Sequence, residues 1–86
     1  MNNKEMEINC KRYLIYTKKD EIRAWKNIIK DYKINIAELV LAGAKLEEIN
    51  KYVKFIEKHL ADINKLDLEI ARLVIEIDKL EKEINN

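Results

Sequence analysis

Isoleucine recurs every seven residues through the second half of the chain, from Ile49 to Ile84. Apolar residues, with one histidine among them, stand three positions after these isoleucines. These are the a and d positions of a heptad repeat, which predicts one long helix from residue 46 with an apolar seam. At 1.5 Å per residue the helix would be about 60 Å long, and its seam must pack on another helix, from this chain or from a second copy. The seam residues expected to mediate oligomerisation are Ile49, Tyr52, Ile56, Ile63, Leu66, Ile70, Leu73, Ile77, Leu80 and Ile84.

The residues that flank this seam argue against a simple parallel dimer. Isoleucine at a with leucine at d favours two parallel strands, but a parallel pairing would place acid against acid at Asp62 and Asp67 and at Glu76 and Glu81. Basic residues three or four positions away on the same helix can instead pair with these acids. Apolar residues beyond the seam predict additional strands or folding back on the first half of the chain.

Composition excludes several classes of chemistry. The 86 residues are 48% apolar and 38% charged, with no serine, no proline, one glycine and one cysteine. So few turn-forming residues predict a mostly helical protein. The sequence offers no serine nucleophile, no glycine-rich phosphate loop and no cluster of metal ligands, so we expect a non-enzyme without metal or cofactor. Cys10 is expected to pack. His59, at a d position, is expected to form a polar layer that sets the register, with a pH switch as the alternative.

Charge is distributed unevenly, although the net charge is only +1. Residues 1–35 contain nine Lys or Arg against five Asp or Glu, whereas residues 36–86 contain eight against eleven. A basic first half favours an anionic partner for that half alone. No segment is apolar enough for a signal peptide or a membrane span, which predicts a cytoplasmic protein with no membrane partner.

The first half of the chain has a less regular pattern. Residues 8–16 alternate in polarity, which predicts a strand, although Met6, Cys10, Tyr13 and Thr17 also recur at helical spacing. Thr17 then resembles an N-cap for a helix that ends near residue 32. A second start signal at Asn35 predicts another helix as far as residue 44. Gly43 allows either close helix approach or a joint to the long helix.

The order strand, helix, turn and helix in KRYLIYTKKDEIRAWKNIIKDYKINIAELVLAGA, residues 11–44, resembles the ribbon–helix–helix family of DNA-binding proteins. The resemblance implies a mostly α fold in which a short N-terminal strand forms an intermolecular β-ribbon, followed by two helices and the long heptad-patterned helix. It divides the chain into a DNA-binding and dimerisation module over 1–45 and an oligomerisation or partner-binding segment over 46–86.

The resemblance also implies how DNA would be bound. The ribbon would enter the major groove and present one face to the base edges. Alternation in the strand assigns that face to Asn9, Lys11, Tyr13 and Ile15. Backbone N–H groups at the start of the second helix would bind a phosphate. The residues expected at phosphates are Arg12, Lys18, Lys19, Lys33, Asn35 and Ile36.

Two functions therefore follow from the sequence. The first is a homodimeric or larger sequence-specific protein that binds double-stranded DNA, such as a transcriptional repressor or a plasmid partition or transfer accessory protein. Its C-terminal helix would also offer a docking site for a larger protein. The second is an all-helical protein-interaction or inhibitor protein, encoded by a phage or plasmid, that does not bind DNA. The second function requires residues 8–16 to be helical.

Overall fold

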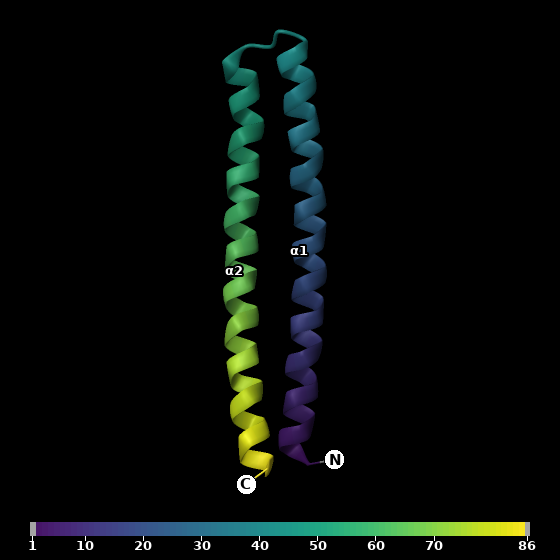
Figure 1. Cartoon of the computed structure of the whole chain (residues 1–86), viewed down its shortest axis with the longest axis vertical. Helices are drawn as coiled ribbons and strands as arrows, with labels where there is room; N and C mark the ends of the chain where they lie inside the picture. The colour runs from purple at the N-terminus through teal and green to yellow at the C-terminus, as the bar shows by residue number, and fades with distance from the viewer. Residues whose placement is uncertain (1, 86) are drawn as a thin grey trace.

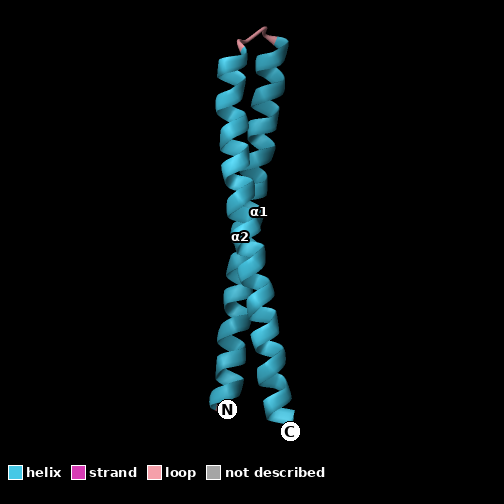
Figure 2. Cartoon of the chain, turned by 90° about the vertical axis from the view of Figure 1, so that its left-hand side faces the viewer, coloured by secondary structure: helices cyan, strands magenta, loops and turns pink. Residues whose placement is uncertain are grey.

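The protein is a hairpin of two long antiparallel helices in the computed structural model, which describes residues 2–85. Helix α1 spans Asn3–Leu41 and helix α2 spans Leu46–Asn85, joined by a four-residue turn. The hairpin is 65 Å long and 16 by 13 Å across, with both termini at the end opposite the turn (Figure 1). Viewed from the side, the helices cross near their middle (Figure 2).

The long heptad-patterned helix predicted from residue 46 is confirmed by α2. All ten seam residues are buried or half-buried against α1, and so is His59. The seam therefore packs on a helix of the same chain.

The predicted β-strand is wrong, and so is the three-helix arrangement. Residues 2–85 contain no strand, and one uninterrupted helix replaces the strand and the first two predicted helices. The hairpin therefore has no β-ribbon, and the resemblance to the ribbon–helix–helix family does not extend to the fold. Thr17 is not an N-cap, because its hydroxyl donates a hydrogen bond of 2.9 Å to the Leu14 carbonyl within the helix. Asn35 likewise lies inside α1.

The physical reason is a second heptad repeat in α1. Isoleucine occupies every seventh position, at Ile8, Ile15, Ile22, Ile29 and Ile36. All five are buried or half-buried. Packing along this full-length row outweighs the strand preference of a nine-residue alternating segment. A helix also pairs its backbone N–H and C=O groups within itself, whereas a lone strand requires a second chain.

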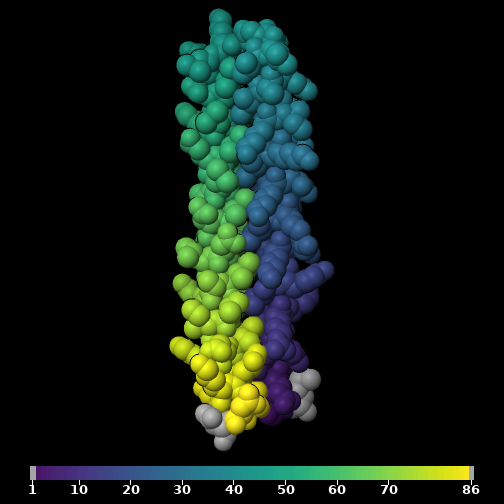
Figure 3. All heavy atoms as spheres, in the orientation of Figure 1, coloured from purple at the N-terminus to yellow at the C-terminus, as the bar shows by residue number. Residues whose placement is uncertain are grey.

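The core lies where these two rows meet. Ile22 and Ile29 of α1 pack with Ile63 and Leu66 of α2, and Trp25 packs against this cluster. The side chains of the two helices meet along the whole hairpin (Figure 3). Because only one layer of residues separates two helices, the core is a line of contacts about one side chain deep, and much apolar surface stays outside it.

Gly43 ends α1 and reverses the chain. Its φ is +75°, a left-handed conformation that costs other residues energy. The Gly43 N–H donates to Val40 O at 3.1 Å, and the Ala44 N–H donates to Leu39 O at 2.9 Å. These two bonds form a Schellman motif, which satisfies the last carbonyls of the helix. Gly43 is therefore the joint between α1 and the heptad helix.

Candidate interaction surface

A ladder of ion pairs fixes the register of the two helices along one edge of the seam. Lysines seven residues apart on α1 each meet a glutamate seven residues apart on α2. The Nζ–Oε2 distances are 3.3 Å for Lys4 and Glu83, 2.8 Å for Lys11 and Glu76, and 2.7 Å for Lys18 and Glu69. The acidic g residues of α2 thus pair with α1, in addition to any basic neighbours on their own helix.

The ladder changes the proton affinity of its members. The hydrogen bond from Lys11 holds the pKa of Glu76 below its ordinary value and raises the pKa of Lys11 itself. The hydrogen bond from Lys18 lowers the pKa of Glu69 in the same way. The charged forms of Lys11, Glu69 and Glu76 are therefore favoured, so these pairs stabilise the hairpin most near neutral pH.

The four residues expected to read DNA bases do not share a face. Ile15 lies in the seam, and the Lys11 ammonium is paired with Glu76. Tyr13 is 68% exposed and points away from the seam, and Asn9, four residues earlier, is exposed on the same side of α1. Alternation in a strand would align all four side chains, but a helix turns by about 100° per residue and divides them into these two pairs.

The residues expected at phosphates are also spread around α1. Arg12 binds Glu81 at 3.1 Å and Lys18 binds Glu69, so both of these cations have acidic partners on α2. Lys19 and Lys33 are exposed. Asn35 and Ile36 are half-buried within α1, where their N–H groups belong to the helix rather than to a helix start.

Aromatic rings cluster in the seam on the turn side of the core. The rings of Trp25 and His59 stack with their centroids 4.4 Å apart, and Tyr32 stacks on His59 at 5.9 Å and on Phe55 at 5.6 Å. Nδ1 of His59 is buried without a hydrogen-bond partner in the described part of the chain, and Asp62 lies 3.7 Å away. His59 is thus a polar residue placed in an aromatic layer of the seam.

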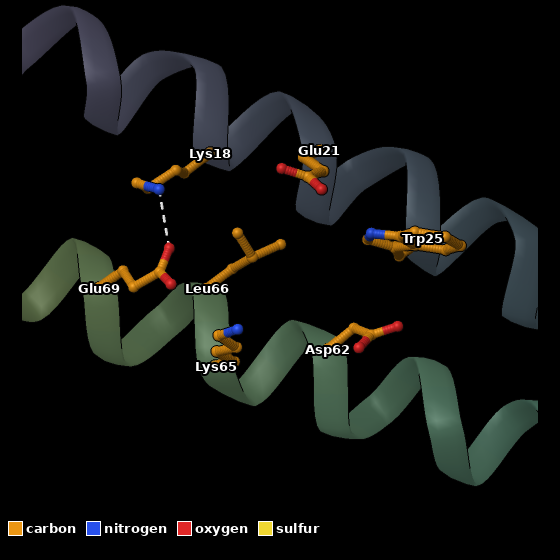
Figure 4. Close-up of a pocket in the computed structure, with 7 residues that line it drawn as sticks. All are labelled: Lys18, Glu21, Trp25, Asp62, Lys65, Leu66 and Glu69. Atoms are coloured by element: carbon orange, nitrogen blue, oxygen red, sulfur yellow. Dashed lines mark hydrogen bonds and ion pairs between the residues drawn. The ribbon is translucent and has the colours of Figure 1, made fainter.

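A shallow hollow lies beside this layer, between Trp25 and the ion pair of Lys18 and Glu69 (Figure 4). Its other lining side chains are Glu21, Asp62, Lys65 and Leu66. Figure 4 shows the Lys18 ammonium turned to Glu69, which closes one end of the hollow. Lys18 and Glu69 are thus occupied with each other, and among residues 2–85 no group of three or more His, Cys, Asp or Glu could hold a metal ion.

A basic row occupies the opposite edge of α1. Its members are exposed and follow one side of the helix at steps of three and four residues. We call this the α1 basic row, and it consists of Lys19, Arg23, Lys26, Lys30 and Lys33. Arg23 pairs with Asp20 on its own helix. None of the four lysines lies within 4.0 Å of an acidic oxygen in the part of the chain that the structure describes, so their charges face solvent.

An apolar stripe occupies the neighbouring side of α2. We call it the α2 apolar stripe. Its residues, with their exposed fractions, are Val53 at 37%, Leu60 at 47%, Leu68 at 70%, Val74 at 52% and Ile75 at 57%. They occupy heptad positions e and f, outside the a and d positions of the seam. The first half of the chain therefore leaves much of the apolar surface beyond the seam exposed.

The basic row and the apolar stripe lie on the same side of the hairpin. Arg12 and Glu81 both occupy e positions, and their ion pair sets the two e rows beside each other. Steps of seven residues from this pair, in opposite directions along the antiparallel helices, place Lys19 beside Val74 and Lys33 beside Leu60. Lys19, Lys26 and Asp67 indeed line one common hollow. The two features run side by side over the same part of the molecule.

Sequence reasoning missed the basic row, although the spacing was present. Lys19, Lys26 and Lys33 stand seven residues apart, as do Arg23 and Lys30. The row is recognised only when the heptad of Ile8, Ile15 and Ile22 is seen, because that heptad makes residues 3–41 one continuous helix. In one helix, residues seven positions apart lie on the same side. Assignment of residues 8–16 to a strand broke this helix into shorter segments and concealed the row.

Neither helix in the described range has a stretch long and apolar enough to cross a membrane. Comparison of the chain with known protein families, with curated proteins and with solved structures finds no match, so the proposals below rest on the chain's own residues.

Proposed function

We propose that the protein is a helical interaction protein whose α2 apolar stripe binds a helix of a partner protein. The observation behind this proposal is the exposure of five apolar side chains on one side of α2. A third helix packed there would cover the stripe and form a three-helix bundle, with the hairpin as a preformed platform.

The distribution of apolar residues on α2 supports this proposal. The a and d positions already supply a complete seam for α1, and the apolar e and f residues keep between 37% and 70% of their surface exposed in the hairpin. Complete burial of a side chain such as Leu or Ile stabilises a complex by about 1.5–3 kcal/mol. Exposed leucines are ordinary when scattered, but five large apolar side chains along one helix side are typical of an interface.

The helical state of residues 8–16 supports the same proposal, because it is the condition that separates an all-helical interaction protein from a ribbon protein. A binding role also fits a surface whose hollows are shallow and open. No activity is needed for such a protein, and the effect on the partner would come from the surface that it covers.

The test uses a synthetic helical probe of about four heptads, with leucine at its a and d positions and uncharged glutamine on both flanks. We expect this labelled peptide to bind the hairpin in a fluorescence anisotropy titration. Leu68→Asp should abolish binding, and Leu41→Asp is the matched control, since Leu41 is 89% exposed but lies at the turn.

Circular dichroism of each variant reports whether the hairpin still folds, and neither exposed position should affect it. Equal binding by the wild type and Leu68→Asp would contradict the proposal, as would the absence of binding by a folded wild type. Sedimentation of the hairpin alone tests the expected homo-oligomer. A dimer abolished by Leu68→Asp would assign the stripe to a second copy instead of a partner protein.

A further inference from the structure

The α1 basic row suggests which kind of helix the stripe binds. Four of its five cations have no acidic partner within the described hairpin, whereas Lys4, Lys11, Arg12 and Lys18 each have a glutamate on α2. The contrast lies along a single helix. Toward the N-terminus of α1 the cations are paired across the seam, and from Lys19 to Lys33 the cations beside the stripe face solvent.

The unpaired cations lie beside the Leu60–Val74 part of the apolar stripe. The row from Lys19 to Lys33 and the segment from Leu60 to Val74 are both about 21 Å long at 1.5 Å per residue, and the register given above sets them side by side. A ligand seated on this part of the stripe therefore has the basic row along one edge.

We propose that the partner is an acidic amphipathic helix, whose apolar side packs on the α2 apolar stripe and whose acidic flank pairs with the α1 basic row. This inference rests on the proposed function and specifies its partner. The α1 basic row alone, or the α2 apolar stripe alone, fits several kinds of ligand. A helix with leucine and glutamate on adjacent sides can contact both surfaces at once. Charge complementarity along one edge also sets the orientation of the bound helix.

Other ligands fit only part of this surface. A nucleic acid would engage the lysines, but it would leave the apolar stripe in water, and Asp67 borders the row where phosphates would lie. A second copy packed antiparallel on the stripe about a two-fold axis would bring the basic row toward its own image. Charges of like sign would then meet beside the stripe.

An anionic bilayer is also a weaker fit. Helices that lie in a membrane interface insert large side chains such as Trp, Phe and Leu from an uninterrupted apolar face. The stripe contains no aromatic residue, and Asp67 stands on the same e row between Leu60 and Val74. In a helix–helix interface this carboxylate can remain at the solvent edge beside Lys26.

The experiment compares three peptides with the same apolar side and with glutamate, glutamine or lysine on the flanks. In low salt we expect the glutamate peptide to bind about tenfold more tightly than the glutamine peptide, from several exposed ion pairs acting together. The lysine peptide should bind most weakly. The difference should shrink in 0.5 M salt, where exposed charges are screened beyond about 4 Å.

Charge reversal in the hairpin gives the matched test. The double variant Lys26→Glu and Lys33→Glu leaves three cations and two acids in the row, so it should remove the preference for the glutamate peptide. The control double variant Lys51→Glu and Lys58→Glu changes the net charge by the same amount, at exposed lysines of α2 outside the stripe. It should keep the order of the three peptide affinities. A change of order with the control would show a general effect of net charge and overturn the inference.

The outcomes separate this inference from the proposed function. Equal binding of all three peptides, with loss in Leu68→Asp, would keep the proposed function and overturn the acidic partner. No binding of any peptide would overturn both. A random-sequence DNA duplex or phosphatidylglycerol vesicles bound more tightly than the glutamate peptide, with loss on reversal of Lys26 and Lys33, would assign the basic row to that ligand and overturn the inference.

Discussion

The ammonium of Lys11 lies 2.8 Å from Oε2 of Glu76, across the seam between α1 and α2. The two residues are 65 positions apart in the chain, and their contact recurs one heptad away in each direction. Lys11 therefore forms an ion pair between the helices. The sequence analysis had predicted that it would contact DNA bases. The pair fixes the antiparallel register of the two helices, and this register determines which residues of α1 lie opposite which residues of α2.

Charge exchange at this pair tests the register. Glu76→Lys should lower the melting temperature, because the new cation faces Lys11 across the seam and lies near Arg72 and Lys79 on its own helix. The double variant Lys11→Glu with Glu76→Lys should recover most of this loss. Thermal unfolding followed by circular dichroism measures both. A double variant no more stable than Glu76→Lys alone would show that the two side chains do not interact.

The ladder predicts a loss of stability in acid. The pKa values of Glu69 and Glu76 are lower in the folded hairpin than the ordinary 4.5, so the unfolded chain binds protons more readily. The stabilisation is complete well above pH 4.5 and is lost as the pH falls through the lowered folded values. Urea unfolding between pH 6 and pH 3 should show this decline.

A double variant, Glu69→Gln with Glu76→Gln, is the control for that decline. It should be less stable at neutral pH, and its free energy of unfolding should show a smaller slope with pH below pH 4.5. If the free energy of unfolding of the double glutamine variant fell as steeply as that of the wild type below pH 4.5, the ladder would not be the cause of the decline.

For Lys11 the sign is opposite, because its pKa is raised above 10.5. Its contribution is complete below pH 10.5 and is lost as the pH rises through the raised value.

Replacement of His59 by phenylalanine should stabilise the hairpin at pH 8 by about 1 kcal/mol, because it removes a buried unpartnered nitrogen and keeps a ring. The ring centroids of Trp25 and His59 are 4.4 Å apart, and phenylalanine can occupy the same position. Chemical denaturation measures the change. Destabilisation by His59→Phe would instead indicate that His59 makes a polar interaction that specifies the register.

Gly43→Ala should destabilise the hairpin by about 1 kcal/mol, since alanine is strained at positive φ. No heavy atom lies within 4 Å of the position that the new methyl group would take, so the cost comes from the backbone alone. Gly43→Asn should lose less, because asparagine tolerates this conformation better. Equal losses for alanine and asparagine would contradict a left-handed turn at Gly43.

The seam and the stripe should respond differently to truncation. Ile63 is 6% exposed, and Ile63→Ala should cost about 2 kcal/mol or more. Leu68→Ala, on the exposed stripe, should change the free energy of unfolding by less than about 0.5 kcal/mol. Urea unfolding at several protein concentrations measures both. A large loss at Leu68 that depends on concentration would point to burial of the stripe between copies.

The sequence by itself determined the helix from Leu46 and the seam residues of α2, because a seven-residue period over five repeats is met by a helix and by no strand. It also determined that this seam needed another helix. The isoleucines from Ile8 to Ile36 contained the matching seam, but a nine-residue segment with alternating polarity is compatible with either period. Local pattern could not choose between strand and helix there.

Only the tertiary structure decided that choice and the surface that follows from it. Packing of α1 on α2 along the full hairpin stabilises residues 8–16 as helix, and the turn at Gly43 makes the partner helix part of the same chain. The antiparallel register then brings residues far apart in sequence to one side of the molecule, as Lys33 and Leu60 show. A one-dimensional pattern specifies which face of each helix is apolar, but the relative placement of two faces depends on contacts between the helices.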